Sequence, residues 1–332
     1  MKNFSIVVPA HNEEKFLPSF LKSVCSQNLL PKEMVLIDDN SNDRTKKIMI
    51  DFQKQNDFKR VFSYKSSCEH MPGSKVVNAF LFGYSKLTKP YDFIFKLDAD
   101  LILPDKYFQL IMNAFSSPRI GIVGGILVEL SKKGIWENSH PMKKNHVRGG
   151  LKAYSKECYK KIGGLIPEMG WDTIDEILAS YHGYEVKVLN NVKVKHLRAI
   201  GNFYSRNASF MQGQAFYKMR YGIIIGTLAC IKGFLIKRSL TFLFWSILGL
   251  LDGYLNKKPY IVTKNQGQFI RRYRFKISKL FHYFISLTSE RCPLIAAAIA
   301  IPGLTKCVLP PLPCLPSKFL LEVEAHLSFG LS

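Results

Sequence analysis

Short apolar runs alternate with segments of helical periodicity through the first hundred residues. Four of these runs have the length and the β-branched, apolar content of strands buried on both faces: residues 4–8, 34–37, 61–64 and 93–97. Helical patterns lie between them, as in residues 75–84. This alternation predicts an α/β fold with a mainly parallel sheet that is flanked by helices on both faces.

Polar clusters follow three of the predicted strands and occupy residues 9–14, 38–43 and 98–100. Ligands of open α/β sheets bind beyond the carboxyl ends of the strands, so we expect the clusters to converge on one crevice. Beyond residue 120 the pattern is less regular. It predicts a strand at 120–129, a loop at 140–150, a helix at 172–181 and two short strands within 186–197.

The third cluster contains two aspartates two positions apart, Asp98 and Asp100. Side chains alternate along a strand, so carboxylates with this spacing at a strand end can point the same way. Two hard oxygen ligands in one place suit Mg²⁺ or Mn²⁺, with diphosphate oxygens completing the shell. Such a metal would neutralise charge on a departing nucleotide diphosphate. Two turn-forming aspartates are the alternative, and the position beside the other clusters favours the metal site.

The second cluster begins with the adjacent carboxylates Asp38 and Asp39. At a strand end they can accept hydrogen bonds from a nucleobase imide and a ribose hydroxyl. Asp39 or Ser41 can also cap the following helix, and both roles are compatible because adjacent side chains point apart. The first cluster can border the base and the ribose, or it can form a turn before an acidic helix start.

Four motifs occur in the order and spacing of a known enzyme family: Val8-Pro9-Ala10-His11-Asn12-Glu13-Glu14, Ile37-Asp38-Asp39-Asn40-Ser41-Asn42-Asp43, Gly73-Ser74-Lys75-Val76-Val77-Asn78-Ala79 and Leu97-Asp98-Ala99-Asp100. On these motifs the chain resembles an inverting family 2 glycosyltransferase with the GT-A fold, the fold of nucleotide-diphospho-sugar transferases. The resemblance covers about residues 3–200. It implies a nucleotide-diphosphate sugar as the donor, with Mg²⁺ or Mn²⁺ as the cofactor.

The resemblance also implies roles for individual residues. Asp39 would be the base-binding carboxylate, with Asp38 beside it. Asp100 would be the principal metal ligand, and Asp98 would contact the ribose or the metal. The donor-binding residues are then expected to be Pro9, His11, Asn12, Glu13, Asp38, Asp39, Lys75, Asn78 and Asp98.

A further cluster, Gly170-Trp171-Asp172-Thr173-Ile174-Asp175-Glu176, contains the candidate catalytic base. In the family, an aspartate lies eleven residues before a Gly-aromatic pair that ends a helix. Gly183-Tyr184 matches that pair, which indicates Asp172 as the base that deprotonates the acceptor hydroxyl. Trp171 replaces the usual glutamate, so Asp175 stays open as the base, and a helix cap is the alternative role for Asp172. Trp171 can stack on an acceptor sugar or belong to the core.

Two more residues resemble functional positions of the family. His196 follows the last predicted strand, where some members carry a histidine near the metal or the diphosphate; a structural histidine is the alternative. Arg148, followed by Gly149-Gly150, resembles the acceptor-side segment. The expected acceptor-binding residues are Trp171 and Arg148, and the expected metal ligands are Asp98, Asp100 and His196.

Basic charge is concentrated toward the C-terminus. Of the formal net charge of +22, +13 falls between residues 206 and 284, where fourteen Lys or Arg residues accompany one acid, Asp252. Basic, apolar-rich segments are attracted to anionic lipids. No nucleic acid partner is expected, because no recognition motif is present and the apolar runs are long.

Two apolar stretches, residues 222–236 and 239–255, lie in this basic region. They can lie in the membrane interface, form a re-entrant hairpin or pack as helices of a soluble subdomain; the second is at the lower length limit for a span. We expect peripheral or re-entrant association with an anionic membrane surface, at the cytoplasmic face of the cell membrane. Seven cysteines without a C-x-x-C pair fit a reducing compartment. No signal peptide is expected, because the strand pattern begins at residue 4.

The predicted organisation has three parts: a GT-A glycosyltransferase domain at 1–205, a basic helical membrane-associated region at 206–288 and an Ala- and Pro-rich tail at 289–332. The expected reaction transfers a sugar with inversion to a hydroxyl of a glycan or lipid-linked acceptor, in surface polysaccharide or glycolipid synthesis. Transfer to a polyprenyl phosphate, which needs no strong base, is one alternative. A catalytically silent nucleotide-binding membrane scaffold is another, and the carboxylates of the predicted site argue against it.

Overall fold

The computed structural model describes residues 2–55, 58–66, 73–131, 133–138, 146–198 and 206–275. The loop predicted at 140–150 is described from residue 146 onward. The tail predicted at 289–332 lies outside the described residues, as does the part of the basic region that begins at Lys276.

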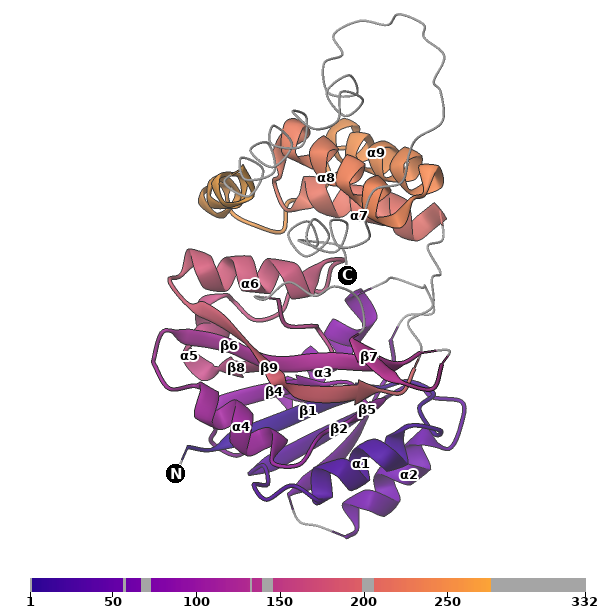
Figure 1. Ribbon diagram of the computed structural model, residues 1–332, viewed down its shortest axis with the longest axis vertical. Helices are drawn as coiled ribbons and strands as arrows, with labels where there is room; N and C mark the ends of the chain where they lie inside the picture. Colours follow the sequence, from indigo (N-terminus) through magenta and orange to yellow (C-terminus); the bar gives the residue numbers. More distant parts are fainter. Residues whose placement is uncertain are drawn as a thin grey trace, which may run out of the picture.

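A mixed β-sheet forms the centre of the first part of the chain (Figure 1). Its described strands are β1 Phe4–Ala10, β2 Glu33–Asp39, β3 Lys59–Tyr64, β4 Phe93–Leu97, β5 Leu101–Ile102, β6 Ile120–Leu130, β7 Trp136–Asn138, β8 Leu151–Ser155 and β9 Glu185–His196. The spatial order is β3-β2-β1-β4-β8-β6-β9-β5, and β7 pairs with β6 off this path.

The predicted parallel alternation is confirmed for β3, β2, β1 and β4, which pair in parallel. Beyond β4 the sheet is mixed, because β8 runs antiparallel to both β4 and β6, whereas β6 and β9 are parallel. Since β1, β2 and β4 run in the same direction, their carboxyl ends lie at one edge of the sheet. The polar clusters that follow these strands therefore meet there.

Several strand predictions differ from the structure. β2 and β3 are longer than predicted, so Asp38 and Asp39 lie at the end of β2. β1 extends beyond the predicted run, so Pro9 belongs to the buried strand and not to the polar loop. The two short strands predicted within 186–197 are one strand, β9, whose pairing with β6 jumps from Val188 to Lys193. Asn190-Asn191 lies in this irregularity, which explains why a turn-like dipeptide interrupts the sequence pattern without ending the strand.

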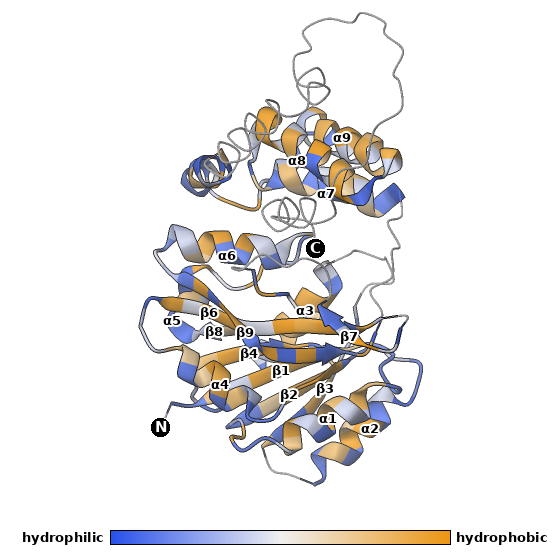
Figure 2. Ribbon diagram, in the orientation of Figure 1, coloured by the Kyte–Doolittle hydropathy of each residue, from blue (hydrophilic) through white to orange (hydrophobic). Residues whose placement is uncertain are grey.

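Helices flank the sheet: α1 Leu17–Cys25, α2 Thr45–Gln53, α3 Ser74–Ser85, α4 Tyr107–Ala114, α5 Lys156–Lys161 and α6 Trp171–Tyr181. α3 packs on β1, β2 and β3, and α4 packs on β6 and β9. The strands between them are strongly apolar (Figure 2), and Phe4, Phe95 and Phe108 meet with ring centroids 5.0–5.4 Å apart. Burial of this apolar surface is the main term that stabilises the fold.

A helical region follows the sheet and stacks beyond α6 (Figure 1): α7 Arg206–Lys218, α8 Gly222–Lys237, α9 Leu240–Leu255 and a further helical segment at 264–275. The backbones of α7 and α9 touch. A Cβ added at Gly213 would lie 1.9 Å from the carbonyl oxygen of Ser246, and one at Gly249 would lie 1.9 Å from that of Phe210. Glycine is required at both positions for this approach. The predicted helical character is therefore confirmed for the described part of the region.

Side chains connect the helical region to the sheet domain. The Lys218 ammonium donates to both carboxylate oxygens of Glu168, at 2.7 and 2.9 Å. The ring of Phe269 packs edge-on against Tyr181 at the end of α6. α8 and α9 have 16 residues each, and none of the described helices combines the length and the apolar character that crossing a membrane requires.

Candidate active site

The loops after β1 and β2 are joined by hydrogen bonds. The Nδ1–H of His11 donates to the carbonyl oxygen of Asp39 at 2.7 Å, and the backbone N–H of Asn12 donates to Ser41 Oγ at 3.0 Å. Asn12 has a positive φ of 54°, which asparagine tolerates better than most residues. Its Oδ1 accepts from the backbone N–H of Asn42 at 2.8 Å. The first two polar clusters therefore form one rim of the site.

The Asp38 and Asp39 side chains both take part in this rim. Asp38 Oδ1 accepts from the backbone N–H of Ser41 at 3.3 Å, and Asp39 Oδ1 accepts from that of Ser66 at 3.1 Å. α2 begins at Thr45 and has no side-chain cap, so the alternative that Asp39 or Ser41 caps this helix is wrong. The nucleobase- and ribose-binding roles of the two aspartates stay predictions.

Asp100 lies in a cluster of charged side chains near the pairing of β5 with β9. Because Leu101 pairs with His196, the Asp100 Oδ2 atom lies 3.2 Å from His196 Nε2, and it is 3.4 Å from Arg198 Nε. Arg198 also donates to Glu13 Oε1 at 2.6 Å, which links the loop after β1 to the end of β9. Asp100 Oδ1 is buried and has no hydrogen-bond partner among the described residues. The structure thus brings two of the predicted metal ligands together.

Burial and charge set the protonation of this cluster. Burial alone would raise the pKa of Asp100, but His196 and the Arg198 guanidinium hold it below its ordinary value. Burial alone would lower the pKa of His196, but Asp100 holds it above its ordinary value. Burial raises the pKa of Glu13 to about 7, against the opposing effect of Arg198. Asp100 is therefore a carboxylate at neutral pH, the form that binds divalent cations.

Asp98 has different neighbours from Asp100. Its Oδ1 accepts from the Lys96 ammonium, and its Oδ2 would lie 2.6 Å from a Cβ added at Gly150. β4 ends just before Asp98, so the chain turns there and the two carboxylates do not follow the alternation of an extended strand. Both carboxylates nevertheless raise the pKa of His196 against the effect of its burial. Asp98 and Asp100 therefore act electrostatically on the same histidine.

Two buried lysines lie on neighbouring strands beneath the carboxylates Asp98 and Asp175 and pair with them. Lys96 on β4 and Lys152 on β8 face each other in antiparallel register and are 1% and 0% exposed. Like charges opposite each other destabilise a sheet unless they are neutralised. Here Lys96 binds Asp98, and Lys152 donates to both Asp175 oxygens at 2.8 and 2.9 Å. The Trp171 ring contacts both, with its centroid 5.3 Å from Lys96 Nζ and 5.7 Å from Lys152 Nζ.

Trp171 and Asp172 begin α6 beside the Gly149-Gly150 turn. A Cβ added at Gly149 would lie 2.6 Å from the Trp171 ring and 3.2 Å from Asp172 Cβ, whereas one at Gly150 would lie 2.6 Å from Asp98 Oδ2. The predicted donor-side carboxylate and the predicted base therefore flank the same two-residue turn. Trp171 is 6% exposed, so it packs in the core. Its acceptor-binding role stays a prediction.

Asp175, the alternative base, is enclosed by donors. It is 2% exposed, and it accepts from the Lys152 ammonium and from the Tyr154 hydroxyl at 2.5 Å. Although burial alone would lower the pKa of Lys152, the carboxylates of α6 hold it above its ordinary value. The N-cap of α6 is Gly170, so the alternative that Asp172 caps this helix is wrong. Asp175 thus has a structural ion pair, and Asp172 is the carboxylate beside the turn.

The remaining predicted residues lie near this turn. Gly73, with a φ of 79°, brings the start of α3 against Trp171, because an added Cβ would lie 3.3 Å from that ring. Lys75 and Asn78 follow on α3. Arg148 precedes the turn, and its Nε is buried without a hydrogen-bond partner in the described part of the chain. The donor- and acceptor-binding roles of these side chains stay predictions.

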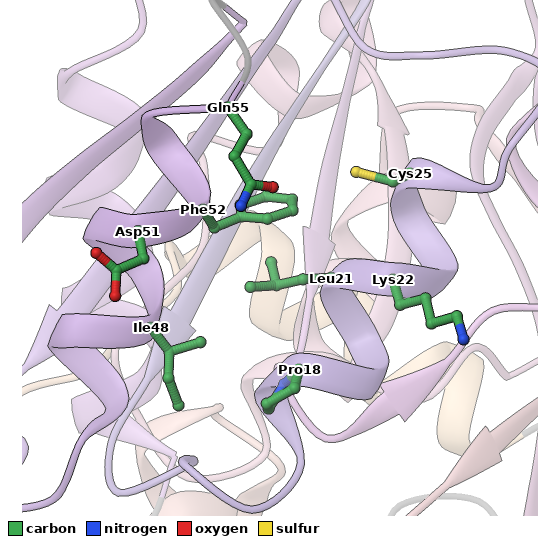
Figure 3. A pocket seen from close by; sticks show the side chains of 8 residues that line it. All are labelled: Pro18, Leu21, Lys22, Cys25, Ile48, Asp51, Phe52 and Gln55. Atoms are coloured by element: carbon green, nitrogen blue, oxygen red, sulfur yellow. The ribbon is translucent and has the colours of Figure 1, made fainter.

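A hollow of about 400 Å³ lies between α1 and α2 (Figure 3). Its lining residues are Pro18, Leu21, Lys22, Cys25, Ile48, Asp51, Phe52 and Gln55. Leu21, Ile48 and Phe52 give it apolar walls. No predicted site residue lines this hollow, so it is separate from the candidate active site.

Several residues of the site were not predicted. Lys96 and Lys152 interrupt otherwise apolar strands, and a lone charge in a buried strand is a signal for an ion pair that the sequence does offer. His146, Glu176 and Arg198 carry no such local signal, because their partners come from distant parts of the chain.

Comparison with known proteins decides the family. The model of the family described as "Glycosyl transferase family 2" matches residues 5–171, which is half of the chain. The chain belongs to this family. The family and the GT-A fold that the motifs predicted are therefore confirmed.

This member of the family is similar to two enzymes over parts of their lengths. Poly-beta-1,6-N-acetyl-D-glucosamine synthase of Staphylococcus epidermidis is 31% identical over 126 residues, which are 38% of this chain and 28% of that protein. GalNAc(5)-diNAcBac-PP-undecaprenol beta-1,3-glucosyltransferase of Campylobacter jejuni is 27% identical over 169 residues, which are 48% of this chain and 52% of that protein. The matched segments thus span from about a quarter to about half of these relatives.

A solved structure supports the fold of the chain. The mannosyltransferase PcManGT from Pyrobaculum calidifontis, in complex with GDP-Man and Mn²⁺, aligns over 90% of this chain and 86% of its own. The TM-score is 0.50 and the sequence identity is 14%. At this identity the likeness shows the shared GT-A fold.

Proposed function

We propose that the protein transfers a sugar from a nucleotide-diphosphate donor to a hydroxyl of a glycan or lipid-linked acceptor, in surface polysaccharide or glycolipid synthesis. The reaction is one direct displacement that inverts the anomeric carbon and is assisted by Mg²⁺ or Mn²⁺. The names of the two relatives, a polysaccharide synthase and a glucosyltransferase for an undecaprenol-linked glycan, support this class of acceptor.

The arrangement around the Gly149-Gly150 turn carries this proposal. Asp98, near the Asp100 cluster, lies against one residue of the turn, and Asp172 lies against the other. A direct displacement requires the leaving diphosphate and the attacking hydroxyl on opposite sides of the anomeric carbon. A donor-side carboxylate and an acceptor-side carboxylate that flank one turn supply the two functions that this reaction needs.

The carboxylate oxygen Oδ1 of Asp100 fits a hard divalent cation. His196 and Arg198 keep the pKa of Asp100 low against the effect of burial, and its Oδ1 is buried with no hydrogen-bond partner in the described ranges. Across those ranges no group of three or more His, Cys, Asp or Glu side chains is arranged to hold a metal ion. Donor diphosphate oxygens and water would therefore complete the shell, as is usual for Mg²⁺. The bound cation would neutralise charge on the departing diphosphate.

The side chains of this protein bind, orient and move a proton. Asp39 and Asp38 hold the nucleoside at the rim formed by the loops after β1 and β2. Asp172 takes the proton of the acceptor hydroxyl as the acceptor oxygen bonds to the anomeric carbon and the bond to the diphosphate breaks. Lys96 fixes Asp98 on the donor side, and Lys152 fixes the start of α6 on the acceptor side.

Calorimetric titration with UDP and GDP tests the donor site. In Mn²⁺ the Asp100→Ala variant should bind the cognate nucleotide at least about tenfold more weakly than wild type, because it loses one charged contact. EDTA should weaken wild type similarly. Asp105→Ala removes an exposed aspartate nearby in the sequence and should bind as wild type does. Equal affinity in Mn²⁺ and EDTA would rule out the metal role, and no binding of either nucleotide would contradict the proposed donor class.

Two other functions predict different results. Transfer to a polyprenyl phosphate needs no strong base, since a phosphate is already anionic, so Asp172→Asn would then leave turnover nearly unchanged. A catalytically silent scaffold would bind a nucleotide and release no nucleotide diphosphate from any sugar donor. The position of Asp172 beside the turn favours transfer to a hydroxyl.

We also propose that the helical region binds an anionic membrane surface, peripherally or as a re-entrant structure, at the cytoplasmic face of the cell membrane. The supporting observation is a set of exposed large apolar side chains on α8 and α9: Ile223, Ile224, Leu228, Ile231, Leu235, Ile236, Leu240, Phe244, Leu251 and Leu255. Figure 2 colours much of the ribbon of both helices as hydrophobic. Half of the formal net charge of +22 lies in the same region, residues 206–275. Exposed apolar surface beside basic charge is what binding to anionic lipid requires.

A further inference from the structure

His146 lies between two carboxylates of α6. Its Nδ1 is 2.9 Å from Glu176 Oε2, and its Nε2 is 3.9 Å from Asp172 Oδ2. Asp172 and Glu176 are four residues apart on α6, so their side chains reach the same side of the helix. The three side chains are 16%, 8% and 9% exposed for His146, Glu176 and Asp172. The imidazole therefore links the proposed base to a second, buried carboxylate.

Glu176 fixes the orientation of this ring. Its Oε1 accepts from the backbone N–H of Val147 at 2.8 Å and lies 3.2 Å from Lys152 Nζ. Although burial alone would raise the pKa of Glu176, Lys152 and His146 hold it below its ordinary value. An ionised carboxylate only accepts hydrogen bonds, so a neutral His146 ring carries its hydrogen on Nδ1. The lone pair of Nε2 then faces Asp172.

We propose that His146 is a positioning residue that receives, through Asp172, the proton of the attacking hydroxyl. The hydroxyl proton moves to Asp172 as the new glycosidic bond forms and the bond to the diphosphate breaks. It then passes from Asp172 to His146 Nε2, which leaves Asp172 ionised and the ring as an imidazolium between two carboxylates. A small side-chain rotation or one bridging water closes the 3.9 Å separation. The ring releases the proton to solvent before the next turnover.

The relay removes the proton from Asp172 after each transfer. A neutral imidazole beside Asp172 Oδ2 draws the proton onward and returns Asp172 to the carboxylate that the next acceptor hydroxyl needs. His146 faces Asp172 and Glu176 from α6, and Lys152 of β8 lies behind Glu176. The relay rests on the proposed function, because it needs a hydroxyl acceptor.

Ring NMR tests the coupling without donor or acceptor. The His146→Gln variant identifies the His146 signal among those of the eight histidines. In Asp172→Asn the Nε2 signal of His146 should shift, and in Glu176→Gln its Nδ1 signal should shift, because each substitution changes the group that faces that ring nitrogen. The signals of the exposed His182 at the end of α6 should stay where they are. Unchanged His146 signals in Asp172→Asn would overturn the proposal.

Turnover tests the proton transfer itself. The assay is nucleotide diphosphate release from UDP-N-acetylglucosamine, UDP-glucose or GDP-mannose, with water as the acceptor. His146→Gln should lower kcat by about 10²-fold, the lower end of general acid–base effects, and should remove the fall in rate on the acid side of the pH profile. Its affinity for the cognate nucleotide and its Tm should match those of His182→Gln, the control variant.

A double variant separates the relay from the base assignment. In the Asp172→Asn background, His146→Gln should cause no further loss, because the proton no longer reaches the ring. Multiplicative losses would overturn the relay. Near-wild-type kcat in Asp172→Asn would instead refute the proposed base. If Asp172→Asn is inactive while His146→Gln keeps the wild-type kcat and pH profile, the relay alone is wrong. If none of these donors is turned over, the ring NMR experiment decides.

Discussion

Lys152 is fully buried and charged, and the acceptor side of the site depends on it. Its ammonium donates to both oxygens of Asp175 and lies 3.2 Å from Glu176. Removing a charge from water is unfavourable unless the charge is paired, so the ammonium and the carboxylates of α6 require each other. On the donor side, Lys96 is 1% exposed and likewise requires a partner, which is the Asp98 carboxylate; Asp98 itself is 36% exposed.

Substitution of Lys152 should therefore destabilise the whole domain. Lys152→Met leaves Asp175 and Glu176 buried without their cation, which should lower the free energy of unfolding by about 3–5 kcal/mol at neutral pH. Lys160→Met, which removes an exposed lysine from α5, should have little effect. Denaturant unfolding measures both, and equal stability of the two variants would show that the buried ion pair is not needed.

Glu13 predicts a pH dependence of stability in the metal-free protein. Burial raises its pKa from 4.5 to about 7, so in this window the folded protein holds a proton that the unfolded chain has lost. Its contribution is therefore greatest below pH 4.5 and is lost as the pH rises to about 7. In EDTA, the Tm of Glu13→Gln relative to wild type should rise across this window. A constant difference would contradict the shifted pKa.

Helices and strands could be predicted from the sequence where their own residues show the periodicity of a helix or a strand. β4 has the predicted bounds, and β1 and β2 are continuous apolar runs because they are buried on both faces. β9 was predicted as two strands because Asn190-Asn191 lies in an irregularity that only its pairing with β6 explains. The approach of His146 to Glu176 and of Arg198 to Glu13 joins distant segments, so no local pattern marks it.

The Gly149-Gly150 turn is the element that separates the donor side from the acceptor side. Gly150→Ala should weaken UDP or GDP binding by about tenfold or more, because its Cβ would lie 2.6 Å from Asp98 Oδ2 and displace that carboxylate. Asp105→Ala, at an exposed position, is the control. If calorimetry shows wild-type affinity for Gly150→Ala, Asp98 has no part in donor binding.

The whole molecule places the proposed base next to the proposed membrane-binding region. α6 carries Asp172 at its start, and the ring contact between Tyr181 and Phe269 joins its end to the helical region. The ion pair of Lys218 with Glu168 joins α7 to the segment that precedes α6. A lipid-linked acceptor held at that surface would therefore approach the site from the side of α6.

Liposome flotation tests this arrangement. Wild type should float increasingly as the anionic lipid content rises, because each basic residue near the surface contributes about 1 kcal/mol. The double variant Ile224→Asp with Leu240→Asp changes two side chains that are each 72% exposed and should float much less. Leu130→Asp, at a 57% exposed position on β6, should float as wild type does. If wild type stays in solution with every lipid mixture, the helical region is not a membrane-binding surface.

Nucleotide diphosphate release by Asp172→Asn and Asp175→Asn is the most direct test of the assigned chemistry. With Mn²⁺ and a donor that wild type turns over, Asp172→Asn should lower kcat by about 10²–10⁴-fold. It should leave nucleotide affinity nearly unchanged, because the base acts on the acceptor. Asp175→Asn should lower Tm, since it breaks the pair with Lys152, and should retain much more of kcat per folded molecule. Near-wild-type kcat in Asp172→Asn, together with a folded but inactive Asp175→Asn, would contradict the assignment of Asp172 as the base.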